Sequence, residues 1–331
     1  MITRGAVSSV IRRRIILLAL VALPALLPAC ASDSEPAEAG QIKNVTLLMK
    51  SKSGDYWKTV KMGAEAAAKE FSVELRVEGP DDEGDVNGQI ELLNRSVKDG
   101  MDALVLAASD YDALGAAVDR MGLPRVPVIA IDSEAGSSRI KSFIGIDNVD
   151  AGQKAGKKLI ELTGGSSRIA VISFGKGGRN AEQRERGLRD ALRAAPGVLA
   201  GATQYCSGSA ERCGELAALL LQREQADGIV ALDAAASLGV AAETERLGFA
   251  GKVKIVTFDN TPEDIEYLQE GIIQATIVQN PFSMGYLGVK YAVDAMNGKR
   301  NPAFMDTGTK VIDQENMFWL DNQKLLFPFV K

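Results

Sequence analysis

Short apolar, β-branched runs alternate with amphipathic helical patterns along most of the chain from Val45 onward. In Tyr56–Phe71, apolar residues recur every three to four positions, as on the buried face of a helix. The first series of predicted strands is Val45–Met49, Val73–Val77, Ala103–Leu106, Val128–Ile131 and Phe143–Ile146, and the helices between them are Tyr56–Phe71, Val86–Lys98 and Tyr111–Met121.

The same alternation then restarts. Two successive series of strand–helix units predict an α/β fold with two doubly wound, parallel-sheet (Rossmann-like) domains. A helix over Ser283–Met296 and the segments around Thr307–Val311 and Met317–Leu320 are left over and are expected to pack on these domains. The second series has strands Ile169–Ser173, Ala202–Tyr205, Gly228–Leu232, Lys254–Phe258 and Ala275–Val278, with helices Val149–Leu162, Ala181–Ala194, Ala210–Arg223, Ala235–Leu247 and Pro262–Glu270.

The N-terminal segment follows a different pattern. Arginines at positions 4 and 12–14 precede an apolar stretch over residues 15–27, which is too short to span a bilayer comfortably, and Ala29-Cys30 closes it. This resembles the lipobox of bacterial lipoproteins, which implies a signal peptide over 1–29, lipid on Cys30 and a flexible polar tether over 30–42. We therefore expect an exported protein, lipid-anchored to the outer face of the cell membrane or in the periplasm. The alternatives are an ordinary signal peptide or an anchor helix with a chance cysteine.

Composition excludes several classes of function. Residues 1–29 carry four arginines and no acid, so their removal takes the formal net charge from −5 to −9, which argues against a nucleic-acid partner. Histidine is absent, which removes Ser-His and Cys-His nucleophile pairs and the commonest zinc ligand, so no metal or cofactor is expected. Cys206 and Cys213 are seven positions apart and predict a local disulfide in an oxidising compartment, with two free thiols as the alternative.

Polar and aromatic residues gather directly after the predicted strands, where open parallel sheets bind ligands. If the two domains face each other, these residues line one cleft. Such a mixture suits a polyhydroxylated ligand, because rings cover the C–H face of a sugar while carboxylates and arginine bind its hydroxyls. The candidates are Lys50 to Trp57, Ser109, Asp110, Asp132 and Ser133 in the first half, and Gly175 to Arg179, Arg184, Asp233, Asp259, Asn260 and Gln279 in the second.

Each candidate also has a purely structural explanation. Thr261 as N-cap and Pro262 at the first helical position account for the turn after Asp259 without any ligand. Similar structural interpretations exist for the other candidates. Tyr56 and Trp57 could be core aromatics, Asp132 could cap a turn, Arg184 could lie on a solvated helix face, and Gln279 could be a surface residue at a strand end.

Together these residues match a known family. The chain resembles the type I periplasmic substrate-binding proteins of the ribose-binding class, the ligand-capturing components of bacterial sugar ABC transporters, over about residues 43–320. The motifs that carry the resemblance are Tyr56-Trp57 with Gly63-Ala64, residues 127–132, residues 144–148 with 151–152, residues 184–187, residues 258–262 and residues 275–281.

The resemblance implies roles for individual residues. Tyr56 and Trp57 correspond to stacking aromatics, and the ligand-binding polar positions are Asp132, Arg184, Asp233, Asp259 and Gln279. The chain departs from the ribose binder, with Ala107 and Gly54 in place of asparagines, Ser133 in place of an arginine, Gly208 in place of an aromatic and Asp233 in place of an asparagine. Ribose itself is therefore not the expected ligand.

The resemblance also implies a domain layout and a mechanism. Three hinge crossovers near 146–147, 279–280 and 306–309 would separate an N-terminal lobe (43–146 plus 280–307) from a C-terminal lobe (147–279 plus 308–331). We expect a monomer that captures a sugar or polyol by hinge closure, without chemistry, for an ABC permease.

The sequence leaves two other functions as alternatives and argues against a third. The first is a ligand-sensing accessory lipoprotein for a transmembrane histidine kinase or chemoreceptor. The second is a glycosidase that uses Asp132 and Asp259 as its carboxylate pair. The third, a repressor of similar fold, would need an N-terminal DNA-binding motif that this sequence lacks.

Overall fold

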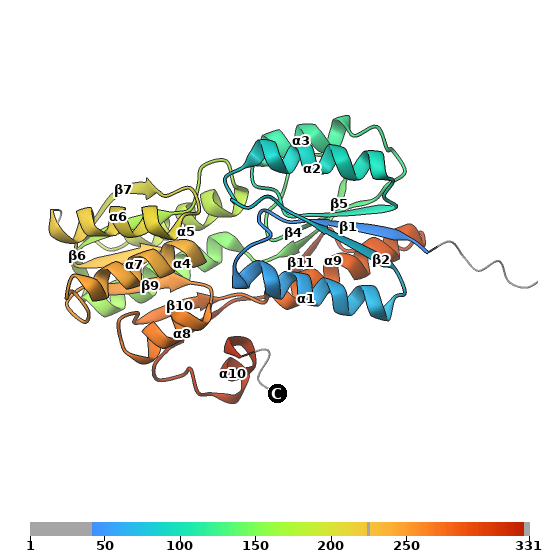
Figure 1. Cartoon of the computed structure of the whole chain (residues 1–331). Helices are drawn as coiled ribbons and strands as arrows, with labels where there is room; N and C mark the ends of the chain where they lie inside the picture. Colours follow the sequence, from blue (N-terminus) through green and yellow to red (C-terminus); the bar gives the residue numbers. More distant parts are fainter. Residues whose placement is uncertain (1–41, 224–225, 328–331) are drawn as a thin grey trace, which may run out of the picture. The chain divides into compact units, whose positions relative to one another are not determined.

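The computed structural model describes residues 42–223 and 226–327 of the 331-residue chain. Within these residues, the strands form two six-stranded sheets with helices on both faces (Figure 1). This confirms the predicted pair of doubly wound α/β units. The predicted signal peptide, Cys30 and nearly all of the tether lie outside the described residues.

The first sheet is parallel throughout, with the spatial order β11-β5-β4-β3-β1-β2. Its helices α1 (Asp55–Glu70) and α9 (Pro281–Met296) cover one face, and α2 (Val86–Asp99) and α3 (Tyr111–Arg120) cover the other (Figure 1). We call this assembly the N-terminal lobe. Its strands are β1 (Asn44–Leu48), β2 (Glu74–Glu78), β3 (Ala103–Leu106), β4 (Val128–Ile131), β5 (Ile140–Gly145) and β11 (Phe304–Asp306).

The second sheet repeats this arrangement, with the order β12-β10-β9-β8-β6-β7. Helices α4 (Asn148–Thr163) and α5 (Arg179–Arg193) cover one face, and α6 (Ala210–Gln222), α7 (Ala234–Arg246) and α8 (Pro262–Gln269) cover the other. We call it the C-terminal lobe. Its strands are β6 (Ser166–Ser173), β7 (Gly197–Tyr205), β8 (Gly228–Ala231), β9 (Lys254–Phe258), β10 (Ala275–Val278) and β12 (Lys310–Asp313).

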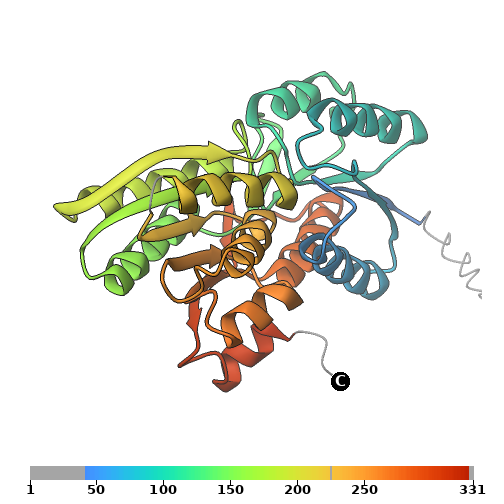
Figure 2. The same cartoon turned by 60° about the vertical axis from the view of Figure 1, so that its left-hand side comes forward.

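The segments left over from the alternation complete the two lobes. The region around 307–311 connects edge strand β11 to β12 and includes the start of β12, which runs antiparallel to β10 and so departs from the all-parallel expectation. Helix α10 (Leu320–Leu326) lies beside α8 (Figure 2), with Leu326 buried in the same apolar cluster as Ile265 and Leu268.

Within the described chain, the backbone passes between the two sheets at three places: from β5 into α4, from β10 into α9, and from β11 into β12. These places separate the two lobes as defined here. Movement of one lobe against the other about these crossings remains a prediction.

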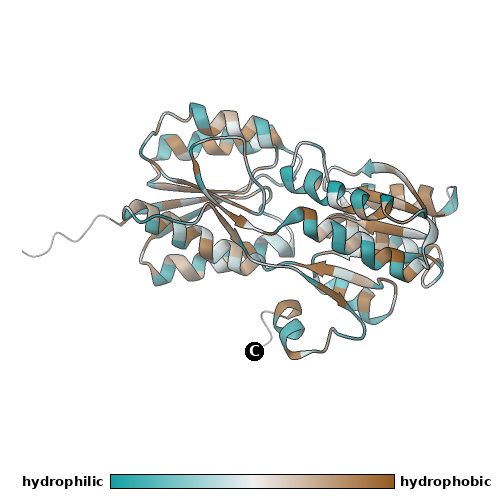
Figure 3. Ribbon diagram, turned by 180° about the vertical axis from the view of Figure 1, so that it is seen from behind, coloured by the Kyte–Doolittle hydropathy of each residue, from teal (hydrophilic) through white to brown (hydrophobic). Residues whose placement is uncertain are grey.

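Apolar strands form the centre of both lobes, and polar residues concentrate on the outer sides of the helices (Figure 3). Each lobe also contains a helix pair in very close contact. A Cβ atom on Gly63 of α1 would lie 2.0 Å from the carbonyl oxygen of Phe282, and one on Gly152 of α4 would lie 2.0 Å from that of Arg184. Only glycine permits these approaches, because a methyl group would overlap the facing backbone.

Local signals in the sequence explain several helix ends. Thr261 and Asp264 form a reciprocal capping box at the start of α8, with Pro262 at the first helical position, as the sequence predicts.

Cys206, after β7, is joined to Cys213 of α6 by a disulfide, with a Cα–Cα distance of 5.1 Å. Among the described helices, none has the length and apolar character needed to cross a bilayer.

Candidate functional site

Two aspartates occupy the same position in the two lobes. Asp132 follows β4 and Asp259 follows β9, and both have a positive φ, 59° and 72°. Their backbone N–H groups donate to Ile144 and Ile277 of the neighbouring strand, at 3.0 and 2.9 Å. Both carboxylates therefore emerge where parallel strands end, which is where this class of sheet binds ligands.

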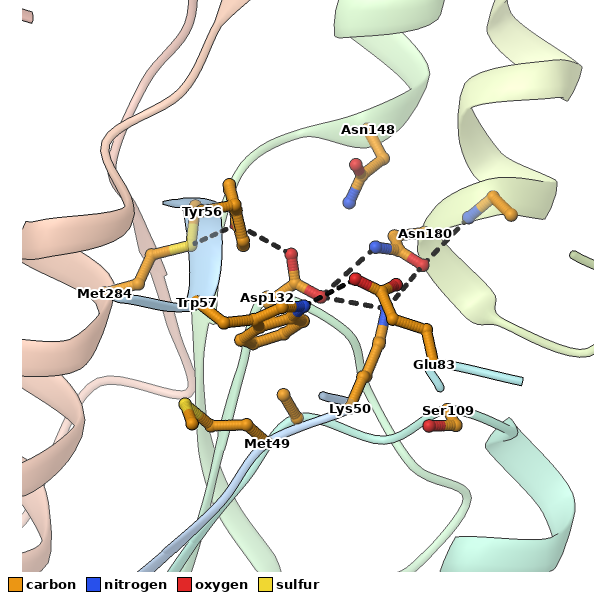
Figure 4. Close-up of polar contacts among 12 residues, drawn as sticks. Met49, Lys50, Tyr56, Trp57, Glu83, Ser109, Asp132, Asn148, Asn180 and Met284 are labelled. Atoms are coloured by element: carbon orange, nitrogen blue, oxygen red, sulfur yellow. Dashed lines mark hydrogen bonds and ion pairs between the residues drawn. The ribbon is translucent and has the colours of Figure 1, made fainter. Parts of the chain in front are cut away.

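The carboxylate of Asp132 belongs to a buried ion pair (Figure 4). Lys50, directly after β1, places its Nζ 2.9 Å from Asp132 Oδ2, and both side chains are almost completely buried. Tyr56 donates its hydroxyl to Asp132 Oδ1 at 2.8 Å. Asn180 of α5 accepts from Lys50 at 3.2 Å and donates to Asp132 at 3.3 Å, so the C-terminal lobe contacts this pair directly.

Trp57 and Glu83 form a second contact at the same edge (Figure 4). The indole N–H of Trp57 donates to Glu83 Oε1, and the tryptophan is only 3% exposed. Burial raises the pKa of Glu83, while attraction to Lys50 opposes the rise. The Glu83 loop touches the C-terminal lobe, since a Cβ on Gly208 would lie 3.4 Å from Glu83 Cβ.

Arg184 of α5 is buried beneath the cleft, with 2% exposure. Its Nε donates to Asn148 Oδ1 at 2.9 Å and its Nη1 to the Leu232 carbonyl at 2.8 Å. The guanidinium also lies over the Phe258 ring, 4.6 Å from its centroid. The alternative of a solvated helix face for Arg184 is therefore wrong.

Asp259 and Gln279 are paired in the C-terminal lobe. Gln279 Nε2 donates to Asp259 Oδ1 at 2.6 Å, and Gln279 Oε1 is buried without a hydrogen-bond partner among the described residues. Burial raises the pKa of Asp259, while the positive charge of Arg184 opposes the rise. With 3% exposure, Gln279 is not a surface residue.

Asp233 is the N-cap of α7 and accepts the N–H of Ala236 at 3.0 Å. Its pKa is raised to about 7, first by burial and then by the negative charge of Glu83. Glu83 comes from the N-terminal lobe and Asp259 and Arg184 come from the C-terminal lobe, and the charges of all three act on Asp233.

The structure thus brings together the seven residues proposed as ligand contacts. Their role in binding remains a prediction. The sequence analysis includes Lys50 among the cleft candidates but assigns no role in the site to Glu83, Asn148 or Asn180. Glu83 follows β2, so the same strand-end rule would have found it had that strand end been considered.

A cavity lies beside the Asp259 and Gln279 pair. It has a volume of about 830 Å³ and is lined by Tyr56, Asp259 and Gln279 together with parts of α8, α9 and α10. Asn260 donates to the Leu325 carbonyl at 2.9 Å, which ties the end of α10 to the loop that carries Asp259. Among the described residues, no group of three or more acidic, histidine or cysteine side chains is arranged to hold a metal ion.

Comparisons with known proteins point to one family. The family described as periplasmic binding protein domain matches residues 45–300. The D-ribose/D-allose-binding protein of Pseudomonas aeruginosa is 28% identical over 297 residues, covering 87% of this chain and 92% of the relative. A carbohydrate transporter solute-binding protein from Agrobacterium radiobacter, solved with D-arabinose, is 30% identical with a TM-score of 0.83, covering 86% of this chain and 99% of its own. The glucose-galactose binding protein GanP of Geobacillus stearothermophilus is also 30% identical, with a TM-score of 0.79 and coverage of 84% and 99%.

Proposed function

The chain belongs to the periplasmic binding protein domain family, and we propose that it captures a sugar or sugar-like polyol outside the cytoplasm for delivery to an ABC transporter. The observation that carries this proposal is the cluster of carboxylates, arginine and aromatic rings contributed by both lobes at their strand ends. Asp132 and Tyr56 come from one lobe, and Asp259, Gln279 and Arg184 from the other.

The proteins with which this chain shares its fold support a sugar as the ligand. The named relatives and structures include binders of ribose or allose, of arabinose, and of glucose and galactose. None of these findings supports the alternative of a sensory accessory protein. The departures from the ribose binder at Ala107, Ser133 and Asp233 favour a sugar other than ribose.

The mechanism is binding coupled to closure. A ligand that contacts both Asp132 and Asp259 gains its full set of hydrogen bonds only when the lobes are together. It therefore shifts the population toward the closed form by its differential affinity for that form. The closed shape is what an ABC permease would recognise, and no step of this mechanism requires bond breaking.

Attachment to the membrane completes the proposal. Lipid on Cys30 would keep the domain near its permease, since acyl chains supply the membrane affinity that an acidic domain lacks. We expect the domain itself to act as a monomer.

A thermal-shift screen tests the function. The panel contains D-ribose, D-allose, D-arabinose, D-fucose, D-glucose, D-galactose, inositols and amino sugars. At one hundred times its Kd, a ligand of the native state stabilises the fold by about 2.7 kcal/mol, which raises the melting temperature. At least one sugar should do so in wild type, and at the same sugar concentration that shift should be clearly smaller in Asp259→Asn. Absence of any shift, together with absence of binding heat in calorimetry across the panel, would reject a sugar-binding function.

A further inference from the structure

The cleft at the strand ends contains more negative than positive charge. Its buried cations are Lys50 and Arg184, and Lys50 is already paired with Asp132 at 2.9 Å. Arg184 lies against the Phe258 ring and donates to the Asn148 side chain and the Leu232 carbonyl, and within the described residues it forms no ion pair with a carboxylate. Against these two cations, the described part of the cleft sets four carboxylates, Glu83, Asp132, Asp233 and Asp259.

Two of these carboxylates come from opposite lobes and repel each other. Glu83 lies in the loop after β2, and Asp233 lies at the end of β8. The Glu83 loop meets the loop after β7, since a Cβ on Gly84 would lie 3.5 Å from the Ser207 carbonyl oxygen. After burial, the negative charge of Glu83 is the largest cause of the raised pKa of Asp233. Closing the lobes therefore brings two like charges together in a region with little water, which is unfavourable unless something neutralises them.

The same region offers hydrogen-bond acceptors that lack donors. Gln279 is 3% exposed, its Nε2 is bonded to Asp259, and its Oε1 lacks a partner within the described chain. Asp233 Oδ1 accepts the Ala236 N–H, and no side chain in the described ranges donates to its Oδ2, which is not fully shielded from solvent. A fully buried acceptor such as Gln279 Oε1 is costly when left unpaired. An ammonium group matches these acceptors, because it has three donors and no acceptor.

We propose that the cleft binds a sugar or cyclitol carrying a protonated amino group, and that this ammonium lies between Glu83 of the N-terminal lobe and Asp233 of the C-terminal lobe. This inference rests on the proposed function and specifies its ligand class. The ligand's charge replaces repulsion between the lobes with attraction to both, so it favours the closed form directly. The Lys50–Asp132 pair is already neutral and is left to bind hydroxyl groups.

Matched ligand pairs test the charge requirement. Calorimetric titration at pH 7 compares D-glucosamine with D-glucose, D-galactosamine with D-galactose, and D-mannosamine with D-mannose. We expect the amino sugar of at least one pair to bind at least tenfold more tightly than its neutral partner and more tightly than every neutral sugar in the panel. Equal or tighter binding by a neutral sugar overturns the inference and leaves the proposed function standing. If no sugar of either kind binds, the proposed function itself is overturned.

Two variants test the placement of the ammonium. Asp233→Asn keeps an N-cap for the Ala236 N–H, and Glu83→Gln keeps an acceptor for Trp57, so both preserve the local hydrogen bonds while removing a charge. Each should reduce the ratio of amino-sugar to neutral-sugar affinity at least tenfold. The control is Asp190→Asn, which removes a carboxylate from the surface of α5, where it pairs with Arg193. An amino-sugar preference that survives both cleft variants would overturn the assigned position.

Discussion

The two lobes share one backbone arrangement, but their strand-end carboxylates have different neighbouring side chains. Asp132 and Asp259 both have a left-handed backbone conformation. The backbone N–H of each donates to the neighbouring strand of its own sheet, and these two strands are equivalent. Asp132 is paired with Lys50 and also accepts from Tyr56. Asp259 accepts from neutral Gln279, and burial raises its pKa. The repeated fold sets where each carboxylate lies, and the neighbouring side chains set how strongly its charge is balanced.

Because of this difference, we expect the two lobes to contribute differently to fold stability and to ligand binding. In the N-terminal lobe, Asp132 takes part in the stability of the fold, because its removal would leave a buried ammonium unpaired. In the C-terminal lobe, Asp233 and Asp259 are charged at a cost to stability, and a donor-rich ligand would offset that cost. Stability should therefore depend more on Asp132, and ligand dependence more on Asp233 and Asp259.

The largest expected effect comes from Asp132→Asn. Breaking a buried ion pair by removing one partner costs ~3–5 kcal/mol of unfolding free energy, because Lys50 would stay buried without its counter-charge. Asp259→Asn is the matched control in the other lobe, since asparagine also tolerates the left-handed conformation, and it should leave stability nearly unchanged or increased. Urea unfolding of the ligand-free proteins measures both. Equal losses in the two variants would contradict the comparison.

The next effect is a pH dependence caused by Asp233. Its pKa is about 7 in the fold against 3.8 without it, so the native state binds the proton more tightly than the unfolded state. Its contribution to stability is therefore fully present below pH 4 and is lost as pH rises to 7. Since each pKa unit corresponds to about 1.4 kcal/mol, the loss is on the order of 4 kcal/mol.

Asp233→Asn removes this titrating group while keeping the N-cap. The difference in unfolding free energy between wild type and the variant should therefore change between pH 4 and pH 8, in favour of the variant at the higher pH. Chemical denaturation at a series of pH values gives this difference. Parallel curves for the two proteins would show that Asp233 titrates normally.

A third test asks whether the two lobes really repeat the same helix contact. Gly63→Ala and Gly152→Ala each place a methyl group 2.0 Å from a facing carbonyl oxygen, so a helix must shift. Overpacking of this kind costs typically ~1–3 kcal/mol, and we expect similar losses in both lobes. Glu65→Ala, on an exposed position of α1, serves as the control. A loss in only one lobe would show that the other contact can relax.

The smallest effect concerns the disulfide, which only the C-terminal lobe has among the described residues. Replacing Cys206 and Cys213 together by alanine should lower the unfolding free energy by about 2 kcal/mol, because the bond closes a short loop. Mass spectrometry of a non-reduced digest first establishes that the bond is present. Recovery of both cysteines as free thiols in protein made in an oxidising compartment would rule it out.

Much of the fold follows from local patterns in the sequence. The start of α8 follows from Thr261 and Pro262 because a cap and a preset φ act within one turn. The first half of β7 was missed for an equally physical reason. This strand, Gly197–Tyr205, lies at the sheet edge with most of its residues exposed, so it lacks the apolar run that marks a buried strand.

The candidate site was only partly predictable. Asp132 and Asp259 follow from the strand-end rule, which needs only the order of elements. The contact between Lys50 and Asn180 joins residues 130 positions apart on different lobes, and no periodicity in the chain encodes it. The same holds for the effect of the Glu83 charge on the pKa of Asp233. The charge balance in the cleft therefore depends on how both lobes are folded and cannot be predicted from local sequence patterns.

We expect carboxylates of both lobes to bind one sugar in the cleft, and calorimetric titration of Asp259→Asn with the best ligand from the screen measures the contribution of the C-terminal lobe. Loss of a charge-assisted hydrogen bond costs ~1.5–3 kcal/mol, so the Kd should rise by roughly 10- to 150-fold while urea unfolding shows an intact fold. An unchanged Kd would contradict the account, because the sugar would then bind without the C-terminal lobe's carboxylate.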